Sequence, residues 1–306
     1  MWRQVFSTLL RGSFRVLPFL PKVPGSLLSV LFPGFCLHCG RELEHSDWTG
    51  ACPTCWAKLR PWPGLSCSAC GLPAAPQSVL RPSGLCDLCH QDAYAFDLAR
   101  SLTVYSGPAR TLILQLKFRH RERLARKLGE ALADSFMNGP FRQLVDFALL
   151  SGNAKDSYQA REEPVLLVPV PLHAARQRER GFNQAERIAQ GLAAAARRAN
   201  CPVRLEVDSR GLRRVKATLP QSGLDFQARQ ENVQGSFQAD NKDSFRGKTV
   251  MLVDDVMTTG ATASACSREL RRAGARKVVV LTVARAAPWL PEVANASRPA
   301  VDDKGA

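Results

Sequence analysis

Four pairs of cysteines with one shared spacing dominate the N-terminal third of the chain. Each pair reads C-x-x-C, a spacing that lets two thiolates converge on one tetrahedral ion, so four pairs supply eight ligands for two Zn²⁺. A disulfide framework is the alternative, but the chain has no convincing export signal, and four identical C-x-x-C pairs are unusual in such a framework. We therefore predict a double zinc ribbon over residues 31–93. The pairs are Cys36/Cys39, Cys52/Cys55, Cys67/Cys70 and Cys86/Cys89.

The spacing alone leaves the pairing of these cysteines open. Sequential pairing, with the first four cysteines on one ion and the last four on the other, gives two stacked ribbons, and an interleaved arrangement has the same spacings. Either way neither ion keeps an open position, so both zinc sites are predicted to be structural. Gly40 and Gly71, each directly after a pair, suit the tight turns of zinc knuckles. Cys201 and Cys266 are unpaired and are interpreted as reduced thiols of a cytoplasmic protein.

Length and charge bound the remaining possibilities. The 306 residues can hold a full core with a smaller unit beside it. The 42 basic and 27 acidic residues leave a formal charge of +15, which favours an anionic partner such as a phosphorylated metabolite, nucleic acid or acidic lipid. Charge alone does not choose among them. No stretch approaches the roughly 18 uninterrupted apolar residues of a membrane span.

The regions outside the ribbon and the core are less informative. Residues 1–30 are basic and apolar and are interpreted as a partly ordered arm, with a membrane-surface role as the alternative. Residues 94–160 are predicted to connect ribbon and core through a strand pair and a helical stretch opened by Pro108. Within that stretch the run 117–127 holds six basic residues and one acid, and it is either a solvated helix face or a polyanion-binding face. Residues 287–306 are predicted to be a disordered tail.

Residues 161–286 alternate between apolar strands and helices. "EPVLLVPVPL" is followed by the helical "RGFNQAERIAQGLAAAARRAN", and "GKTVMLVDDV" is followed by "TASACSRELRRAGA" and the strand "KVVVLTVA". This alternation predicts a parallel α/β sheet covered on both faces. Ligands of such sheets bind at the carboxyl ends of the strands, where Asp254, Asp255 and the "TTGAT" loop lie.

The segment "VMLVDDVMTTGATAS" joins two kinds of chemistry. A glycine-containing loop that runs into a helix N-terminus presents backbone N–H groups and threonine hydroxyls to a phosphate. The two carboxylates beside it would repel a phosphate, but they suit polyol hydroxyls or a hydrated Mg²⁺. A sugar phosphate with free vicinal hydroxyls satisfies both halves of the segment.

Two other interpretations of this segment compete. An apolar strand ending in acids is also typical of a Walker B element, and "GKT" at 247–249 is similar to the end of a Walker A motif. The required first glycine falls at Lys242, however, and the GKT precedes its strand, which argues against a P-loop NTPase. The structural alternative is a buried strand in which Asp255 caps the next helix.

The same residues carry a family resemblance. "VMLVDDVMTTGAT" resembles the PRPP-binding signature of type I phosphoribosyltransferases. Together with the "CLHCG" ribbon, "VPVPLHAARQRERGFNQAERIA" and "LRRVKATLPQSGLDFQARQENVQGSF" resemble the ComF family, double-zinc-ribbon, phosphoribosyltransferase-like proteins associated with competence and use of external DNA. The resemblance implies an α/β fold with a sheet of the type I phosphoribosyltransferase kind behind an N-terminal double zinc ribbon.

The resemblance also implies roles for residues. The paired acids, Asp254 and Asp255, would hold the ribose hydroxyls of PRPP with Mg²⁺, and Arg180 would lie near the position of the pyrophosphate loop. The 5-phosphate would be bound by Thr258, Thr259, Gly260, Ala261 and Thr262, and a mobile hood over PRPP would include Arg214, Thr218, Gln221, Arg229 and Asn232. A hood excludes water, which protects an oxocarbenium-like centre from hydrolysis.

Two functions remain open from the sequence. One is a Mg²⁺-dependent phosphoribosyltransferase in which a nucleophile displaces pyrophosphate from C1 of PRPP. The other is a non-catalytic accessory protein that binds single-stranded DNA or a competence helicase and keeps the PRPP site as a sensor or relic. The sequence indicates neither the acceptor, nor whether turnover occurs, nor the oligomeric state.

Overall fold

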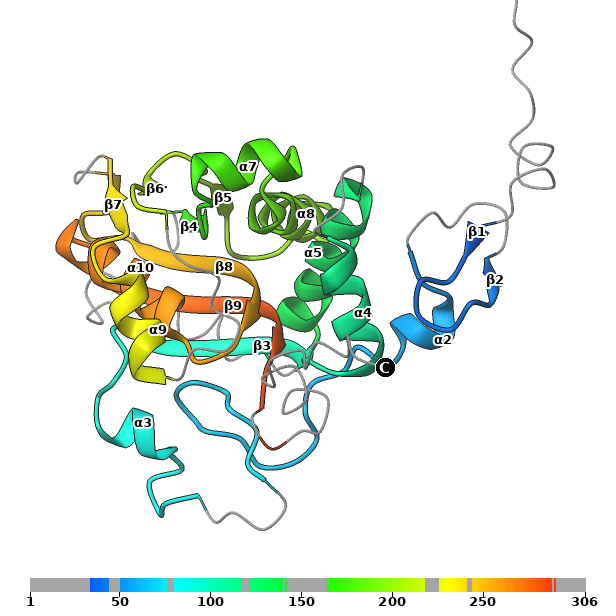
Figure 1. Ribbon diagram of the computed structural model, residues 1–306, viewed down its shortest axis with the longest axis horizontal. Coiled ribbons are helices and arrows are strands. Elements are labelled where there is room, and N and C mark those ends of the chain that lie inside the picture. Colours follow the sequence, from blue (N-terminus) through cyan, green and yellow to red (C-terminus); the bar gives the residue numbers. More distant parts are fainter. Residues whose placement is uncertain are drawn as a thin grey trace, which may run out of the picture.

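The computed structural model describes residues 34–43, 50–75, 80–116, 121–139, 141, 164–217, 226–240, 244–287 and 289. Its centre is a five-stranded, wholly parallel sheet with the strand order β3-β9-β8-β4-β5 (Figure 1). The strands are β3 (Leu98–Val104), β4 (Val165–Pro169), β5 (Leu205–Val207), β8 (Thr249–Met257) and β9 (Lys277–Arg285). Every residue of β4 is buried, as expected for a strand covered on both faces. The predicted parallel α/β sheet is confirmed.

The strand order creates a switch point between β4 and β8. These two strands are neighbours in register, with Pro169 opposite Val253. From β4 the chain crosses to β5 on one side, and from β8 it crosses to β9 on the other. Connections that leave adjacent strands in opposite directions open a crevice at their carboxyl ends, and open α/β sheets bind ligands there.

Helices cover both faces of the sheet. α4 (Gly107–Gln115), α5 (Glu122–Met137) and α8 (Gln184–Arg198) pack on one face, and α10 (Ala261–Arg272) packs on the other beside α9 (Phe226–Val233). Because successive side chains of a strand point to opposite faces, Met251 and Val253 of β8 enter the first core while Val250 and Leu252 enter the second. α5 and α8 lie side by side (Figure 1).

Smaller elements surround this core. α7 (Ala174–Arg180) lies between β4 and α8, and the short strands β6 (Leu212–Arg214) and β7 (Phe237–Ala239) pair antiparallel with α9 between them in the chain. The ribbon region contains β1 (Gly34–Phe35), β2 (Glu42–Leu43), α2 (Pro53–Trp56) and α3 (Asp87–His90). None of the described helices is long and apolar enough to cross a membrane.

The two cysteine-rich units occupy different places on the core (Figure 1). Cys36, Cys52 and Cys55 are buried in the core that α4, α5 and α8 make. Cys67 and Cys70 are buried in the core on the α10 side. The expected stacking of the two ribbons is therefore wrong, because each ribbon buries its apolar surface against the α/β core instead of against the other ribbon.

One expectation for the connecting region differs from the structure, and the first residues of the predicted tail contact the rest of the chain. The segment read as a strand pair after residue 93 forms one strand, β3, which pairs with β9 and so gains a partner far along the chain. Beyond residue 286, Ala287 is buried and the Trp289 ring packs edge-on against Trp62 with centroids 5.4 Å apart. The Trp289 Nε1–H also donates to the Pro73 carbonyl, 3.2 Å away, so the start of the predicted tail is anchored. Residues 290–306 and the 1–30 arm lie outside the described residues.

Candidate functional site: two cysteine tetrads and the strand-end carboxylates

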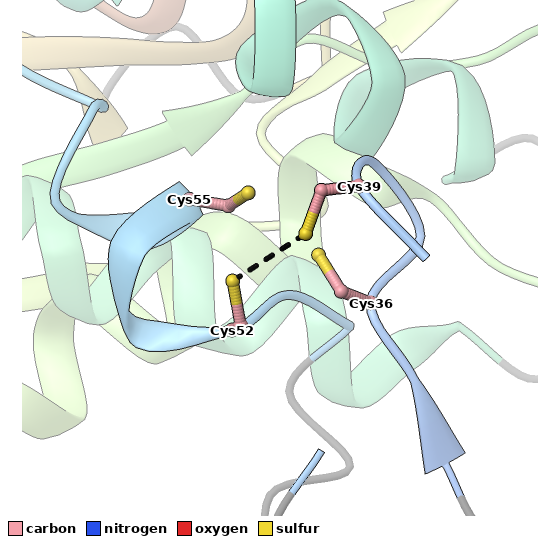
Figure 2. A group of neighbouring side chains, drawn as sticks. All are labelled: Cys36, Cys39, Cys52 and Cys55. Carbon is pink, nitrogen blue, oxygen red and sulfur yellow. Dashed lines mark hydrogen bonds between the residues drawn. The ribbon is translucent and has the colours of Figure 1, made fainter. Parts of the chain in front are cut away.

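The eight ribbon cysteines form two tetrads that pair sequentially. One contains Cys36, Cys39, Cys52 and Cys55, and the other contains Cys67, Cys70, Cys86 and Cys89, with the sulfurs of each tetrad all within 4.8 Å of one another. Figure 2 shows the four side chains of the first tetrad pointing toward a common centre. The Cys39 and Cys52 sulfurs are 3.7 Å apart, as are those of Cys70 and Cys86. A regular tetrahedron with Zn–S bonds of about 2.3 Å has sulfurs roughly 3.8 Å apart, so both tetrads fit Zn²⁺.

The backbone around the tetrads has the shape of zinc knuckles. Gly40 N–H donates to the Cys36 carbonyl and Gly71 N–H to the Cys67 carbonyl, each over 3.0 Å. Both glycines have positive φ, 71° and 65°, a conformation that glycine adopts without strain. The Cys86 N–H lies 3.3 Å from the Cys67 sulfur and can donate to it. The predicted role of these two glycines is confirmed.

We expect purified protein to hold two zinc ions per chain. Because structural zinc supplies much of the folding free energy of such small units, chelation should open residues 34–90 to limited proteolysis while the sheet core survives. The variant Cys36→Ser with Cys39→Ser should lose one zinc ion and keep the other, which elemental analysis measures. Fewer than one zinc per chain in carefully prepared wild-type protein would contradict this assignment.

The paired carboxylates lie near the carboxyl end of β8, one of the two strands of the switch point. The Asp254 Oδ1 accepts a hydrogen bond of 2.8 Å from the Asp255 N–H. The Asp255 Oδ2 accepts one of 3.4 Å from Nε2 of Gln184, the first residue of α8. Helix α10 is capped by Gly260, so the alternative in which Asp255 caps the next helix is wrong.

Burial dominates the electrostatics of this pair. It raises the pKa of Asp254 well above the usual range of a carboxyl, and the neighbouring Asp255 raises it further. The Arg214 guanidinium opposes this rise through its charge, and burial lowers the pKa of Arg214 itself. Arg214 also stacks over the Phe237 ring, 5.4 Å from its centroid. The structure thus brings one member of the predicted hood into the electrostatic range of the acids.

The loop after β8 turns sharply into α10. Gly260 has φ +81°, and a Cβ built there would lie 2.8 Å from both Met257 Cε and Tyr94 Cε1, so only glycine fits. The Thr259 Oγ1 accepts a 3.4 Å hydrogen bond from the Ala261 N–H. Ala261 and Thr262 begin the helix, whose first-turn N–H groups and dipole make its end electropositive. This loop and helix end can bind an anion.

Three of the remaining predicted residues lie on α7 and α9. Arg180 is the last residue of α7, in the segment that connects β4 to α8. The two ends of this segment are joined by Asn183, whose Nδ2 donates to the Val170 carbonyl over 3.0 Å. Arg229 and Asn232 lie on α9, which packs against α10. Thr218 and Gln221 lie outside the described residues.

Several residues at the site were not predicted. Tyr94 Oη donates to the Thr259 carbonyl over 2.7 Å, and the buried Arg285 donates to the carbonyls of Met257 and Thr258. Neither contact leaves a local sequence signal. Asn183 caps α8 by accepting from the Ala185 N–H over 3.0 Å, and the spacing N-x-x-E of Asn183 and Glu186 is the signal that could have revealed this cap.

Comparisons with known proteins agree with this architecture. A double zinc ribbon domain model matches residues 27–90, and a phosphoribosyl transferase domain model matches residues 153–303. The DNA utilization protein YhgH of Salmonella typhimurium is 32% identical over 83% of this chain and 97% of its own. Competence protein F of Haemophilus influenzae is 30% identical over 82% of this chain and 96% of its own. Competence protein ComFC of Bacillus subtilis is 26% identical over 73% and 78%.

The first two of these relatives are matched over nearly their whole length. The two domain models match the cysteine-rich region and the sheet in that order along this chain. The chain therefore belongs to the ComF family, in which a double zinc ribbon precedes a phosphoribosyltransferase-like domain.

Proposed function

We propose that the protein binds PRPP with Mg²⁺ in the crevice at the carboxyl ends of β4 and β8, and that it uses this site in the handling of external DNA. One observation carries the proposal. Two adjacent half-buried carboxylates, Asp254 and Asp255, lie six and five residues before Gly260, the N-cap of α10. Acceptors for vicinal hydroxyls and donors for a phosphate thus follow one another along a single stretch of chain, from the end of β8 to the start of α10.

Each part of PRPP has a partner in this arrangement. Asp254 and Asp255 accept hydrogen bonds from the ribose hydroxyls, and residues 258–262 bind the 5-phosphate through backbone N–H groups and threonine hydroxyls. Arg180, on the excursion after β4, is the candidate for the pyrophosphate. Arg214, Arg229 and Asn232 belong to the segment proposed to cover the ligand, together with Thr218 and Gln221.

If turnover occurs, the reaction is displacement of pyrophosphate from C1 of the ribose by a nucleophile. Mg²⁺ supplies charge neutralisation for the pyrophosphate when it is bound with PRPP. The protein's contributions are positioning, fixed dipoles and the exclusion of water from an oxocarbenium-like centre. The half-buried environment of Asp254 strengthens each electrostatic contact there, because the effective dielectric constant is lower than that of bulk water.

The alternative proposal is a non-catalytic accessory role in which PRPP is sensed and single-stranded DNA is bound elsewhere. The relatives are named for DNA utilization and competence and not for a transferase activity. In addition, Arg123, Arg126 and Lys127 of the basic run are exposed on α5, although Lys127 also pairs with Glu130 at 3.4 Å. Lys117 and Arg119 lie outside the described residues, so the run remains either a binding face or a solvated one.

Calorimetric titration with PRPP and Mg²⁺ tests the proposal. We expect saturable binding at one site per chain, weakened when Mg²⁺ is omitted because the pyrophosphate then keeps its full charge. A pyrophosphate-release assay with candidate nucleobases follows. Release with an acceptor supports the transferase, and binding without release under every acceptor supports the sensor. Absence of any PRPP binding by zinc-loaded protein would overturn both.

A further inference from the structure

Two side chains bind backbone carbonyls in and directly before the loop between β8 and α10, residues 258–260, which is called the phosphate loop because it is proposed to bind the 5-phosphate. Arg285 Nη1 donates to the carbonyls of Met257 (2.9 Å) and Thr258, and Tyr94 Oη donates to the carbonyl of Thr259 (2.7 Å). The described part of the chain has no cis peptide bonds. In a trans peptide the N–H points away from its carbonyl. Fixing these three carbonyls therefore also fixes the directions of the three N–H groups of residues 258–260, which are the donors that a phosphate needs.

The segment that contains Tyr94 contacts helix α10 as well as the loop. Its ring leaves no space for a Cβ at Gly260, and it stacks on Phe96 with centroids 4.8 Å apart. The next residue, Ala95, donates its N–H to Ser264 Oγ on the first turn of α10 over 3.1 Å. Burial raises the pKa of Tyr94, so its hydroxyl stays protonated and remains a donor at physiological pH. Residues 94–96 thus pack against one side of the phosphate loop and the start of α10.

The second cysteine tetrad is directly connected along the chain to residues 94–96. Tyr94 follows the last ligand, Cys89, by five residues, and the turn between them is closed by the Ala93 N–H donating to the Leu88 carbonyl over 3.0 Å. The turn between Cys67 and Cys70 is hydrogen-bonded to β3. The Ala99 N–H donates to the Ala69 carbonyl over 2.8 Å, and Arg100 Nη2 donates to the Ser68 carbonyl over 2.9 Å. Cys67 and Cys70 share their core with Met257 and Ala261 of the loop. The first tetrad lies on the other core: Cys36, Cys52 and Cys55 are buried with α4, α5 and α8.

We propose that the second tetrad controls PRPP affinity: Tyr94 is a positioning residue for the phosphate loop, and the loop keeps its binding geometry only while Cys67, Cys70, Cys86 and Cys89 hold zinc. The inference rests on the proposed PRPP site. Coupling of two sites is reciprocal, so bound PRPP must also retain the zinc of the second tetrad. The first tetrad is a structural site without this effect.

Titration of matched variants tests the coupling. Tyr94→Phe keeps the ring and removes one neutral hydrogen bond, so the Kd for PRPP with Mg²⁺ should rise about 3- to 10-fold. Cys86→Ser with Cys89→Ser should lose one zinc and raise the Kd more than Tyr94→Phe does. Cys36→Ser with Cys39→Ser, the matched control, should also lose one zinc but should bind PRPP as the wild type does. Equal PRPP affinity in the wild type and in the Tyr94 and second-tetrad variants overturns the inference while the PRPP site stands.

A measurement on unmodified protein covers the case in which a cysteine variant does not fold. Zinc transfer to a chromogenic chelator should show two phases, of which PRPP with Mg²⁺ slows only one. The variant Asp254→Asn with Asp255→Asn controls for zinc binding by PRPP itself, and it should show no protection. If the wild type binds PRPP and both phases keep their rates, the inference fails. If the wild type binds no PRPP at all, the proposed function fails, and the inference with it.

Discussion

Replacing Asp254 and Asp255 together by asparagine is expected to abolish PRPP binding. The pair supplies acceptor oxygens for the ribose hydroxyls, and each lost charge-assisted hydrogen bond costs about 1.5–3 kcal/mol. Two such losses weaken binding by roughly 100- to 10,000-fold, since about 1.4 kcal/mol corresponds to a factor of ten. Calorimetric titration of the double variant beside the wild type measures this. Near wild-type affinity in the double variant would show that the acids do not contact the ligand.

The same variant should be at least as stable as the wild type at neutral pH, which separates loss of the site from loss of the fold. Burial raises the pKa of Asp254 in the folded protein, so between the unfolded value of about 3.9 and the raised folded value the native state binds more protons than the unfolded state. Stability of the wild type therefore falls as pH rises through this range. Asparagine does not titrate, so the advantage of the variant in Tm should be greater at pH 8 than at pH 5. A variant less stable at both pH values would indicate that the carboxylates are structural.

The raised pKa of Asp254 is typical of a functional residue. A half-buried carboxylate beside a second carboxylate destabilises the fold at neutral pH, and a chain without need of it would place an apolar or amide side chain there. Functional sites are where such unfavourable arrangements persist. Gln184 supports the same interpretation, since it is buried and directs Nε2 to Asp255, while its Oε1 has no hydrogen-bond partner among the described residues.

The sequence predicted those features whose signals are local. The C-x-x-C pairs, the alternation of apolar strands with helices, and the acids followed by a glycine-containing loop each lie within one short stretch, and each is determined by local chemistry. The pairing of the cysteines and the placement of the two ribbons against different cores depend on packing. The spacing therefore left the pairing open, and the stacking expected for sequential pairing is not observed. Tyr94 could not be found for the same reason, because the carbonyl that it binds lies 165 residues further along the chain.

The contact between α5 and α8 is another feature that only packing reveals. A Cβ built on Gly129 would lie 2.1 Å from the Ile188 carbonyl oxygen, and one on Gly191 would lie 2.2 Å from the Arg126 carbonyl oxygen. Two glycines thus let the backbones of the helices touch. Glycine is less favourable than alanine in a helix by about 0.8–1.0 kcal/mol. From the sequence alone these glycines therefore indicate weak helix positions and not a contact between α5 and α8.

Gly191→Val is accordingly expected to destabilise the protein severely. The added side chain meets backbone and not a flexible side-chain end, so the helices must separate. Overpacking of this kind costs about 1–3 kcal/mol or more, a large part of a total that is roughly 5–15 kcal/mol for a folded domain. Even Gly191→Ala should be destabilised on balance, because the clash exceeds the gain in helix propensity. Denaturant unfolding measures both.

Ala194→Val is the matched control for this helix. It places the same side chain three residues further along α8, at a partly exposed position outside the core contacts, and should cost no more than about 0.7 kcal/mol in propensity. Because Gln184 at the start of α8 reaches Asp255, any folded fraction of Gly191→Ala should also bind PRPP more weakly than Ala194→Val does. Equal stability of Gly191→Val and Ala194→Val would show that α5 and α8 do not pack backbone to backbone. The position of Gln184 beside the acids would then need another explanation.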